Sequence, residues 1–283
     1  MRRYFALVLA GTFLIALASP ARAQDAKPIL APEGYDYAPA AKKVAAKFNG
    51  TPGVFLHLGD SITYANQNTA WARGGQGHTA AEKAFIAWSH GGKRNDNDGW
   101  YLASVDVPNG RSHTAASGVR ADQYLAGGKG GLPPLADIVK KHKPQMALYM
   151  LGTNDISAGR PVAQYIADVE KAVDLLEAAG TVVILSTLPP YKGKAKEVDA
   201  YNAALRDLAK KKQLPLIDLN AEMKARAGEQ MEQAYLSSDG VHLSNEKAGG
   251  PANAENLRSC GYLLRCYLAV HKGMEVKAKV FDK

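Results

Sequence analysis

Short apolar runs recur along the chain and predict buried strands. They cover residues 53–58, 145–151, 181–187 and 214–219, and residues 101–107 are a weaker candidate. Between them, residues 135–142, 162–179 and 196–212 carry apolar side chains at the 3.6-residue period of a helix. Continuous apolar strands that alternate with helices are typical of a parallel sheet covered on both faces. We therefore expect an α/β fold, a three-layer α/β/α sandwich around a central parallel sheet.

The first 23 residues have the three-part pattern of a signal peptide. Arg2 and Arg3 precede an apolar run over residues 4–18, and Ala21-Arg22-Ala23 supplies small residues for cleavage. The apolar run is too short to anchor the chain across a bilayer. We expect an exported protein, periplasmic or secreted, without a stable membrane span. Residues 24–45 read as an extended lead and residues 46–283 as one domain.

The charge balance does not indicate nucleic-acid binding. The net charge is +8, and it falls to +5 without the first 23 residues, which hold three arginines and no acid. The basic residues are scattered, so the excess is compatible with a polyanionic or cell-surface substrate but is also explained by solubility alone. The Cys and His spacing does not suggest zinc, and we expect no metal. The sequence does not indicate an oligomeric state.

The two cysteines, Cys260 and Cys266, raise the question of a disulfide in an exported protein. Apolar residues around them, over 257–271, have helical spacing. Six residues of helix rise about 9 Å, beyond the usual reach of a disulfide. Helix and disulfide are therefore mutually exclusive here, and we expect a helix with two buried thiols.

Polar clusters follow the predicted strands, where open parallel sheets bind their ligands. Asp60 and Ser61 come directly after the first strand, Asn154 follows the strand over 145–151, and Asp239 and His242 lie downstream of the last. A serine hydroxyl needs a neighbouring base to become a nucleophile, and an imidazole needs a carboxylate to fix its tautomer. An amide with backbone N–H groups can hold the resulting oxyanion. This set of residues predicts acyl transfer.

The same residues carry a family resemblance. Gly59-Asp60-Ser61-Ile62-Thr63, Gly152-Thr153-Asn154-Asp155 and Asp239-Gly240-Val241-His242-Leu243 resemble conserved blocks of the SGNH hydrolases, also called the GDSL esterase/lipase family. The resemblance covers about residues 53–270 and implies a flavodoxin-like hydrolase domain without a cofactor. It implies Ser61 as nucleophile, His242 as base and Asp239 as its partner. The implied oxyanion hole comprises the Ser61 and Gly118 N–H groups and Asn154, with Gly110 as the alternative to Gly118.

The substrate is predicted less directly. The long insert over residues 64–117 contains Trp71, Trp88 and Trp100, which suit stacking on a sugar ring, although burial in the core is the competing interpretation. With no long aliphatic run in this insert, we expect a short, acetyl ester of a carbohydrate. The alternatives are a lysophospholipase or thioesterase, a saccharide O-acyltransferase, and a saccharide-binding protein with an inactive triad.

Other polar residues have structural interpretations. Ser61 could simply cap the helix after the first strand. His57, inside that strand, is expected to be a packed core histidine. Asp60 and Asp155 are expected to hold the loops of the site by hydrogen bonds to nearby backbone.

Overall fold

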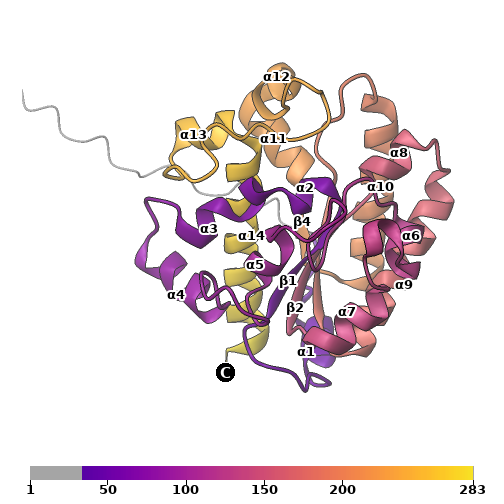
Figure 1. Cartoon of the computed structure of the whole chain (residues 1–283), viewed down its shortest axis with the longest axis vertical. Coiled ribbons are helices and arrows are strands. Elements are labelled where there is room, and N and C mark those ends of the chain that lie inside the picture. The colour runs from indigo at the N-terminus through magenta and orange to yellow at the C-terminus, as the bar shows by residue number, and fades with distance from the viewer. Residues whose placement is uncertain (1–33, 283) are drawn as a thin grey trace, which may run out of the picture.

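The computed structural model describes residues 34–282, and its centre is a parallel sheet of four strands (Figure 1). The strand order is β1-β2-β3-β4, so each strand pairs with the next one in the sequence. All four main strand predictions are confirmed. The strands are β1 (Phe55–Gly59), β2 (Met146–Met150), β3 (Val182–Ser186) and β4 (Leu216–Ile217).

Helices cover both faces of this sheet, which confirms the three-layer prediction. In Figure 1, one group lies on the side of the sheet opposite the C-terminal helix α14. The three helices predicted between the strands all belong to this group, within a residue of their expected bounds. The group comprises α6 (Ala121–Ala126), α7 (Leu135–His142), α9 (Val162–Ala178) and α10 (Ala195–Lys212). The other face is covered by α1 (Ala38–Ala45) and α14 (Gly261–Val276), which contact β3 and β4 respectively.

The last strand is shorter than its apolar run suggests. Residues 214–219 were expected to form it, but β4 ends at Ile217. The Asp218 side chain accepts a hydrogen bond from the Ala221 N–H, at 3.1 Å, and caps helix α11 (Leu219–Ala227). This cap gives the Ala221 N–H, at the start of the helix, a hydrogen-bond partner. It therefore favours a helix over a longer strand at this point.

The strand expected over residues 101–107 is wrong, because this segment begins as helix α5 (Gly99–Ser104). The Asp98 carboxylate caps the helix by accepting from the Tyr101 N–H, at 3.0 Å. Gly99 packs so closely on β1 that a Cβ there would lie 1.8 Å from the Phe55 carbonyl oxygen.

The edge of β1 that faces away from β2 is not paired with a full strand. A flavodoxin-like sheet has a further strand beside its first one. Among the described residues, that position holds a single parallel bridge, between Gly59 and Ala115. The Thr114 hydroxyl adds a hydrogen bond to the His57 carbonyl, at 2.7 Å.

Shorter elements connect and flank the main helices and strands. The helices among them are α2 (Ser61–Tyr64), α3 (Ala70–Gly74), α4 (Ala80–Trp88), α8 (Thr153–Ser157), α12 (Met231–Tyr235) and α13 (Ala254–Ser259). Single turns of 3-10 helix cover Asn66–Thr69, Lys129–Gly131 and Gly228–Gln230, and a π-helical turn covers Lys277–Phe281. None of the helices within residues 34–282 has the length and apolar character needed to cross a membrane.

Two terminal predictions need correction. The lead expected over residues 24–45 ends in helix α1, whose Ala41 is buried in the common core next to Tyr37. Its first residues, 24–33, and the predicted signal peptide lie outside the described residues. At the other end, the single helix expected over 257–271 is broken at Cys260, which has an extended backbone. Cys260 and Cys266 are both buried and unbridged, as the helical interpretation expected.

His57 is a core residue, as predicted. Its ring lies 4.6 Å from the Phe55 ring and 4.2 Å from the Trp100 ring, measured between centroids. Neither ring nitrogen has a hydrogen-bond partner in the described chain. Burial, followed by the positive charge of Arg265, keeps the pKa of His57 well below its usual value. His57 is therefore a neutral packing group.

Candidate active site

The sharp turn after β1 presents Ser61 at the carboxyl end of the sheet. Asp60 caps the short helix α2 by accepting from the Ile62 N–H, at 3.0 Å. Ser61 is the first residue of that helix and is half-buried. Gly59 is required at the strand end, because a Cβ there would lie 2.1 Å from the Thr63 hydroxyl oxygen. The turn thus fixes where the Ser61 hydroxyl lies.

Ser61, His242 and Asp239 form a continuous chain of hydrogen bonds. The His242 Nε2 lies 2.9 Å from the Ser61 Oγ, and the His242 Nδ1 lies 2.6 Å from the Asp239 Oδ2. The imidazole is therefore held between a hydroxyl and a carboxylate. In this geometry one ring nitrogen can accept the serine proton while the other remains bonded to the carboxylate.

The turn that carries Asp239 holds its carboxylate in the ionised form. The Asp239 Oδ1 accepts hydrogen bonds from the Val241 N–H at 2.8 Å, the His242 N–H at 2.9 Å and the Ser237 hydroxyl at 2.8 Å. Partial burial works against ionisation, but these hydrogen bonds and the one from the His242 ring outweigh it. They hold the pKa of Asp239 well below its usual value. A negative charge beside His242 favours the imidazolium that forms when the ring takes a proton.

The three donors predicted to form an oxyanion hole differ in their present partners. Neither the Ser61 N–H nor the Gly118 N–H has a hydrogen-bond partner within residues 34–282. The Asn154 amide donates to the Val119 carbonyl at 3.1 Å and to the Asp60 Oδ2 at 3.2 Å. Because Val119 directly follows Gly118, this contact favours Gly118 over Gly110. Both Asn154 amide hydrogens already have partners, so an oxyanion would have to share one of them.

Asp60 is buried next to this amide. Burial raises the pKa of its carboxyl to about 6, although the Ile62 N–H and the positive charge of Arg265 act in the opposite direction. Asp60 thus holds the α2 terminus through a nearby backbone N–H, as predicted, and also holds the Asn154 amide, which was not predicted. It does so through a carboxylate that is costly to ionise.

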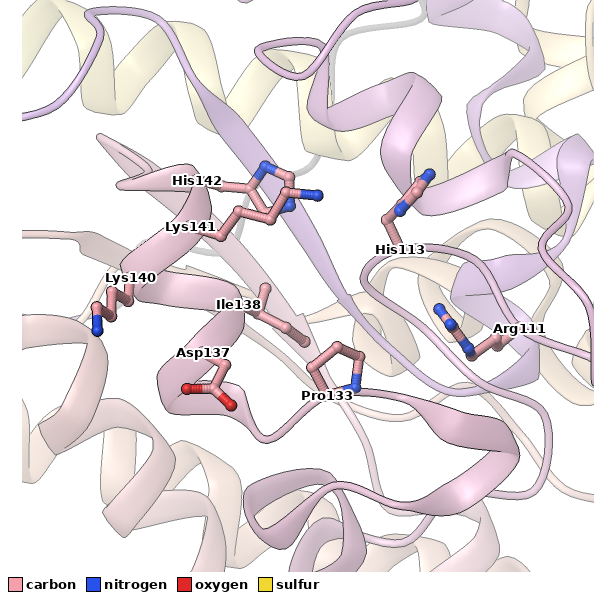
Figure 2. Close-up of a pocket in the computed structure, with 8 residues that line it drawn as sticks. All are labelled: Arg111, His113, Pro133, Asp137, Ile138, Lys140, Lys141 and His142. Atoms are coloured by element: carbon pink, nitrogen blue, oxygen red, sulfur yellow. The ribbon is translucent and has the colours of Figure 1, made fainter.

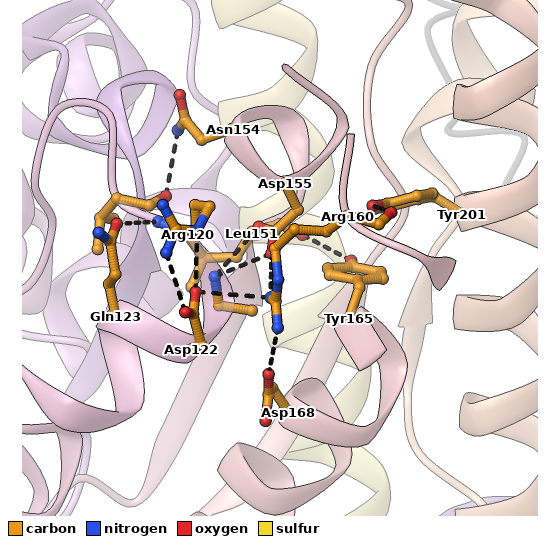
Figure 3. A network of polar contacts seen from close by, with 12 residues as sticks. Arg120, Asp122, Gln123, Leu151, Asn154, Asp155, Arg160, Tyr165, Asp168 and Tyr201 are labelled. Carbon is orange, nitrogen blue, oxygen red and sulfur yellow. Dashed lines mark hydrogen bonds and ion pairs between the residues drawn. The ribbon is translucent and has the colours of Figure 1, made fainter. Parts of the chain in front are cut away.

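A buried polar network fixes the helix that carries Asn154 (Figure 3). The next residue, Asp155, accepts from the Ala121 N–H at 3.1 Å and pairs with the Arg160 guanidinium at 2.5 Å. Arg160 also pairs with Asp168 on α9, at 2.7 Å. Its carbonyl accepts from the Tyr201 hydroxyl on α10, at 2.6 Å. Helices α6, α9 and α10, which cover one face of the sheet, therefore anchor α8. No pattern in the sequence singles out Arg160.

Two of the three tryptophans predicted to bind substrate, Trp71 and Trp100, are inaccessible to it. Trp71 and Trp100 are fully buried, and their indole N–H groups donate to the Gln76 carbonyl at 3.0 Å and the Ser89 hydroxyl at 2.9 Å. Trp88 is half-buried and packs against Phe85 and Phe281. The alternative interpretation, that these residues are core, therefore holds for Trp71 and Trp100. Trp88 also packs against neighbouring aromatic rings.

A polar groove of about 440 Å³ borders the turn that carries Asp239. Ser237, Ser238 and Gly240 of that turn form one wall. The remaining lining is almost entirely hydrogen-bonding side chains, with Leu236 the apolar exception. It comprises Lys192, Glu229, Gln230, Glu232 and Gln233. These side chains can form hydrogen bonds to the hydroxyl groups of a ligand.

A second groove, of about 590 Å³, lies between α7 and the segment that carries Arg111 and His113 (Figure 2). Burial lowers the pKa of His113 and of His142, so both rings are neutral at pH 7. Neither groove is lined by Ser61, His242 or Asp239, and the second groove, unlike the first, does not border the turn that carries Asp239. The lining comprises Arg111, His113, Pro133, Asp137, Ile138, Lys140, Lys141 and His142. Across residues 34–282, no three His, Cys, Asp or Glu side chains are grouped as metal ligands would be.

Residues 57–246 match the model of the GDSL-like lipase/acylhydrolase family. This span includes every member of the hydrogen-bonded chain and every predicted oxyanion donor. None of the curated proteins matches the chain significantly in sequence.

Several solved structures of ester hydrolases are similar to this chain. A family 3 carbohydrate esterase from Talaromyces cellulolyticus superposes with a TM-score of 0.52 and 19% identity, covering 80% of this chain and 98% of the other. A GDSL-like lipase from Bacteroides thetaiotaomicron gives 0.48 and 16%, covering 86% and 98%. A psychrotrophic esterase from a Pseudoalteromonas species gives 0.48 and 16%, covering 78% and 98%. At 19% identity the likeness to the Talaromyces enzyme concerns the fold alone.

The Asp155–Arg160 pair gives a direct test of how Asn154 is held. Replacing Arg160 by Met leaves the fully buried Asp155 carboxylate without its cation, and we expect the free energy of unfolding to fall by about 3–5 kcal/mol. Lys171→Met is the matched control. Lys171 also pairs with Asp168, at 3.0 Å, but its side chain is exposed to solvent. That change should cost less than about 1 kcal/mol. Urea denaturation of both variants measures the difference, and equal costs would contradict the assignment.

Proposed function

Because the chain belongs to the GDSL-like lipase/acylhydrolase family, we propose that it hydrolyses short-chain, chiefly acetyl, esters of carbohydrates through Ser61, His242 and Asp239. Family membership makes the chain a carboxylic ester hydrolase. The observation that carries the proposed mechanism is the chain of hydrogen bonds from Ser61 through His242 to Asp239.

The proposed reaction proceeds through an acyl-enzyme. The Ser61 Oγ attacks the ester carbonyl carbon while the His242 Nε2 takes the hydroxyl proton, and Asp239 stabilises the imidazolium. The negative charge on the former carbonyl oxygen is held by the Ser61 and Gly118 N–H groups and by Asn154. The intermediate collapses, its ester C–O bond breaks, and His242 returns the proton to the departing alcohol. Water then repeats the sequence and releases the carboxylic acid.

The groove beside the Asp239 turn supports a carbohydrate as the alcohol. Its amide, hydroxyl and charged side chains can bind sugar hydroxyl groups, and it borders the turn that orients His242. The fold shared with a carbohydrate esterase from Talaromyces cellulolyticus is consistent with this choice. Because Trp71 and Trp100 are buried, the carbohydrate proposal rests on this groove and not on aromatic stacking.

We also propose that the protein is exported, on the strength of the basic, apolar and small-residue pattern over residues 1–23. Cleavage after Ala23 would make Gln24 the first residue of the mature chain. N-terminal sequencing of the protein from the periplasm or culture medium should find Gln24. Finding Met1 on a protein confined to the cytoplasm would contradict export.

The triad is tested by rates on p-nitrophenyl esters. Ser61→Ala removes the nucleophile, and we expect acetate turnover to fall by about 10³-fold or more, because the residues of a triad act as a unit. Ser259→Ala, which removes an exposed serine hydroxyl on α13, is the matched control and should keep the full rate. Acetate should also be hydrolysed faster than octanoate. A Ser61→Ala protein with full activity would exclude the mechanism, and preference for octanoate would favour a lipid substrate.

The role of the groove is tested by comparing an acetyl ester of a sugar with an acetyl ester that contains no sugar. A Gln230→Ala/Gln233→Ala variant should raise the KM for glucose pentaacetate several-fold, because each lost amide removes hydrogen bonds to the sugar. The KM for p-nitrophenyl acetate should not change. Gln164→Ala, on an exposed face of α9, is the control. If both substrates respond equally, or neither responds, the groove does not bind the carbohydrate.

A further inference from the structure

A buried arginine lies beneath the nucleophile turn. Arg265, on the C-terminal helix α14, is only 2% exposed. Its Nη2 donates to the Thr63 hydroxyl at 2.9 Å, while its Nε and Nη1 have no hydrogen-bond partner within residues 34–282. A guanidinium in this position is costly unless an opposite charge compensates it.

Asp60 is the compensating charge. The groups that favour the charged form of Arg265 are Tyr262, Asp60 and Cys266. Burial raises the pKa of the Tyr262 hydroxyl, and raises that of the Cys266 thiol to about 12, so both are neutral at pH 7. Asp60 is therefore the one carboxylate among them.

Thr63 links the Arg265 guanidinium to the backbone of Asp60. Its hydroxyl accepts from Arg265, and its N–H donates to the Asp60 carbonyl, at 3.0 Å. The Asp60 side chain, which is 1% exposed, accepts from the Asn154 amide. A path of contacts thus leads from α14 to the amide of the proposed oxyanion hole.

We propose that Arg265 is a positioning residue: its buried positive charge keeps Asp60 as a carboxylate, and this carboxylate holds the Asn154 amide and the N-terminus of α2. The link to catalysis rests on the proposed function, since it requires that Asn154 binds an oxyanion. The electrostatic link between Arg265 and Asp60 does not.

Other charges also act on Asp60 and enter the test. His242, from the turn over residues 237–243, favours the carboxylate when it is protonated. Asp155, from α8, opposes it. Both groups remain in the variants below, so a change in the titration of Asp60 reports on Arg265.

The test is the titration of Asp60 in the full chain, followed by NMR of ¹³C-labelled aspartate carboxyls and assigned with Asp60→Asn. Arg265→Met should raise the Asp60 pKa by about one unit or more, because the nearby opposite charge is lost. Arg265→Lys keeps the charge and should restore most of the shift. Arg258→Met, an exposed arginine on α13, is the control and should change nothing. An unchanged Asp60 titration in Arg265→Met overturns the proposal.

Kinetics test the catalytic consequence. At pH 7, Arg265→Met should lower kcat for p-nitrophenyl acetate about ten-fold with little change in KM, because a displaced amide affects the transition state more than ground-state binding. The acid limb of the kcat profile should move to higher pH. In an Asp60→Asn background the same change should have no further effect on kcat. An equal loss in both backgrounds would show that Arg265 does not act through Asp60.

A stability comparison covers the case in which Arg265→Met alone does not fold. In Asp60→Asn, Arg265 is a buried charge without its carboxylate, so adding Arg265→Met should leave the protein at least as stable. A double variant that is less stable than Asp60→Asn overturns the coupling. If the wild-type chain hydrolyses no ester, the proposed function fails, but the carboxyl titration still decides whether Arg265 controls Asp60.

Discussion

The site depends on the contacts that the buried Asp60 carboxylate makes. It joins three parts of the chain: the turn after β1, the Asn154 amide after β2, and the charge of Arg265 on α14. The parallel pairing of Gly59 with Met150 brings the ends of the two strands side by side and makes the contact between Asp60 and Asn154 possible. Burying a carboxylate in this position costs free energy unless hydrogen bonds and an opposite charge compensate it.

The reactive groups and their supports differ in burial. Ser61 and His242 are half-buried, and Asp239 is exposed, so a substrate can reach them. Asp60, Asp155 and Arg265 are buried. They bond to neighbours of the reactive groups: Asp60 to Asn154, Asp155 to Arg160, and Arg265 to Thr63. This division lets the chemistry occur at the surface while packed, charged partners restrict the movement of Asn154 and α2.

The sequence predicted what depends on local pattern and on family blocks. Apolar runs located the strands, and Ser61, Asn154, Asp239 and His242 could be named before the structure. Helix α5 was missed because its cap, Asp98, and its close contact with β1 through Gly99 outweigh the strand-like composition of residues 101–107. The burial of Trp71 and Trp100, and the roles of Arg160 and Arg265, depend on contacts between segments far apart in the chain. Such contacts leave no periodic or motif signal.

The central claim is that Ser61 is a nucleophile activated by His242. Its most direct test is covalent labelling of the full chain with a fluorophosphonate, read by intact mass and peptide mapping. The account predicts one label per chain, on Ser61, and strongly reduced labelling in His242→Ala. Absence of labelling, labelling at another serine, or an undiminished rate in His242→Ala would contradict it.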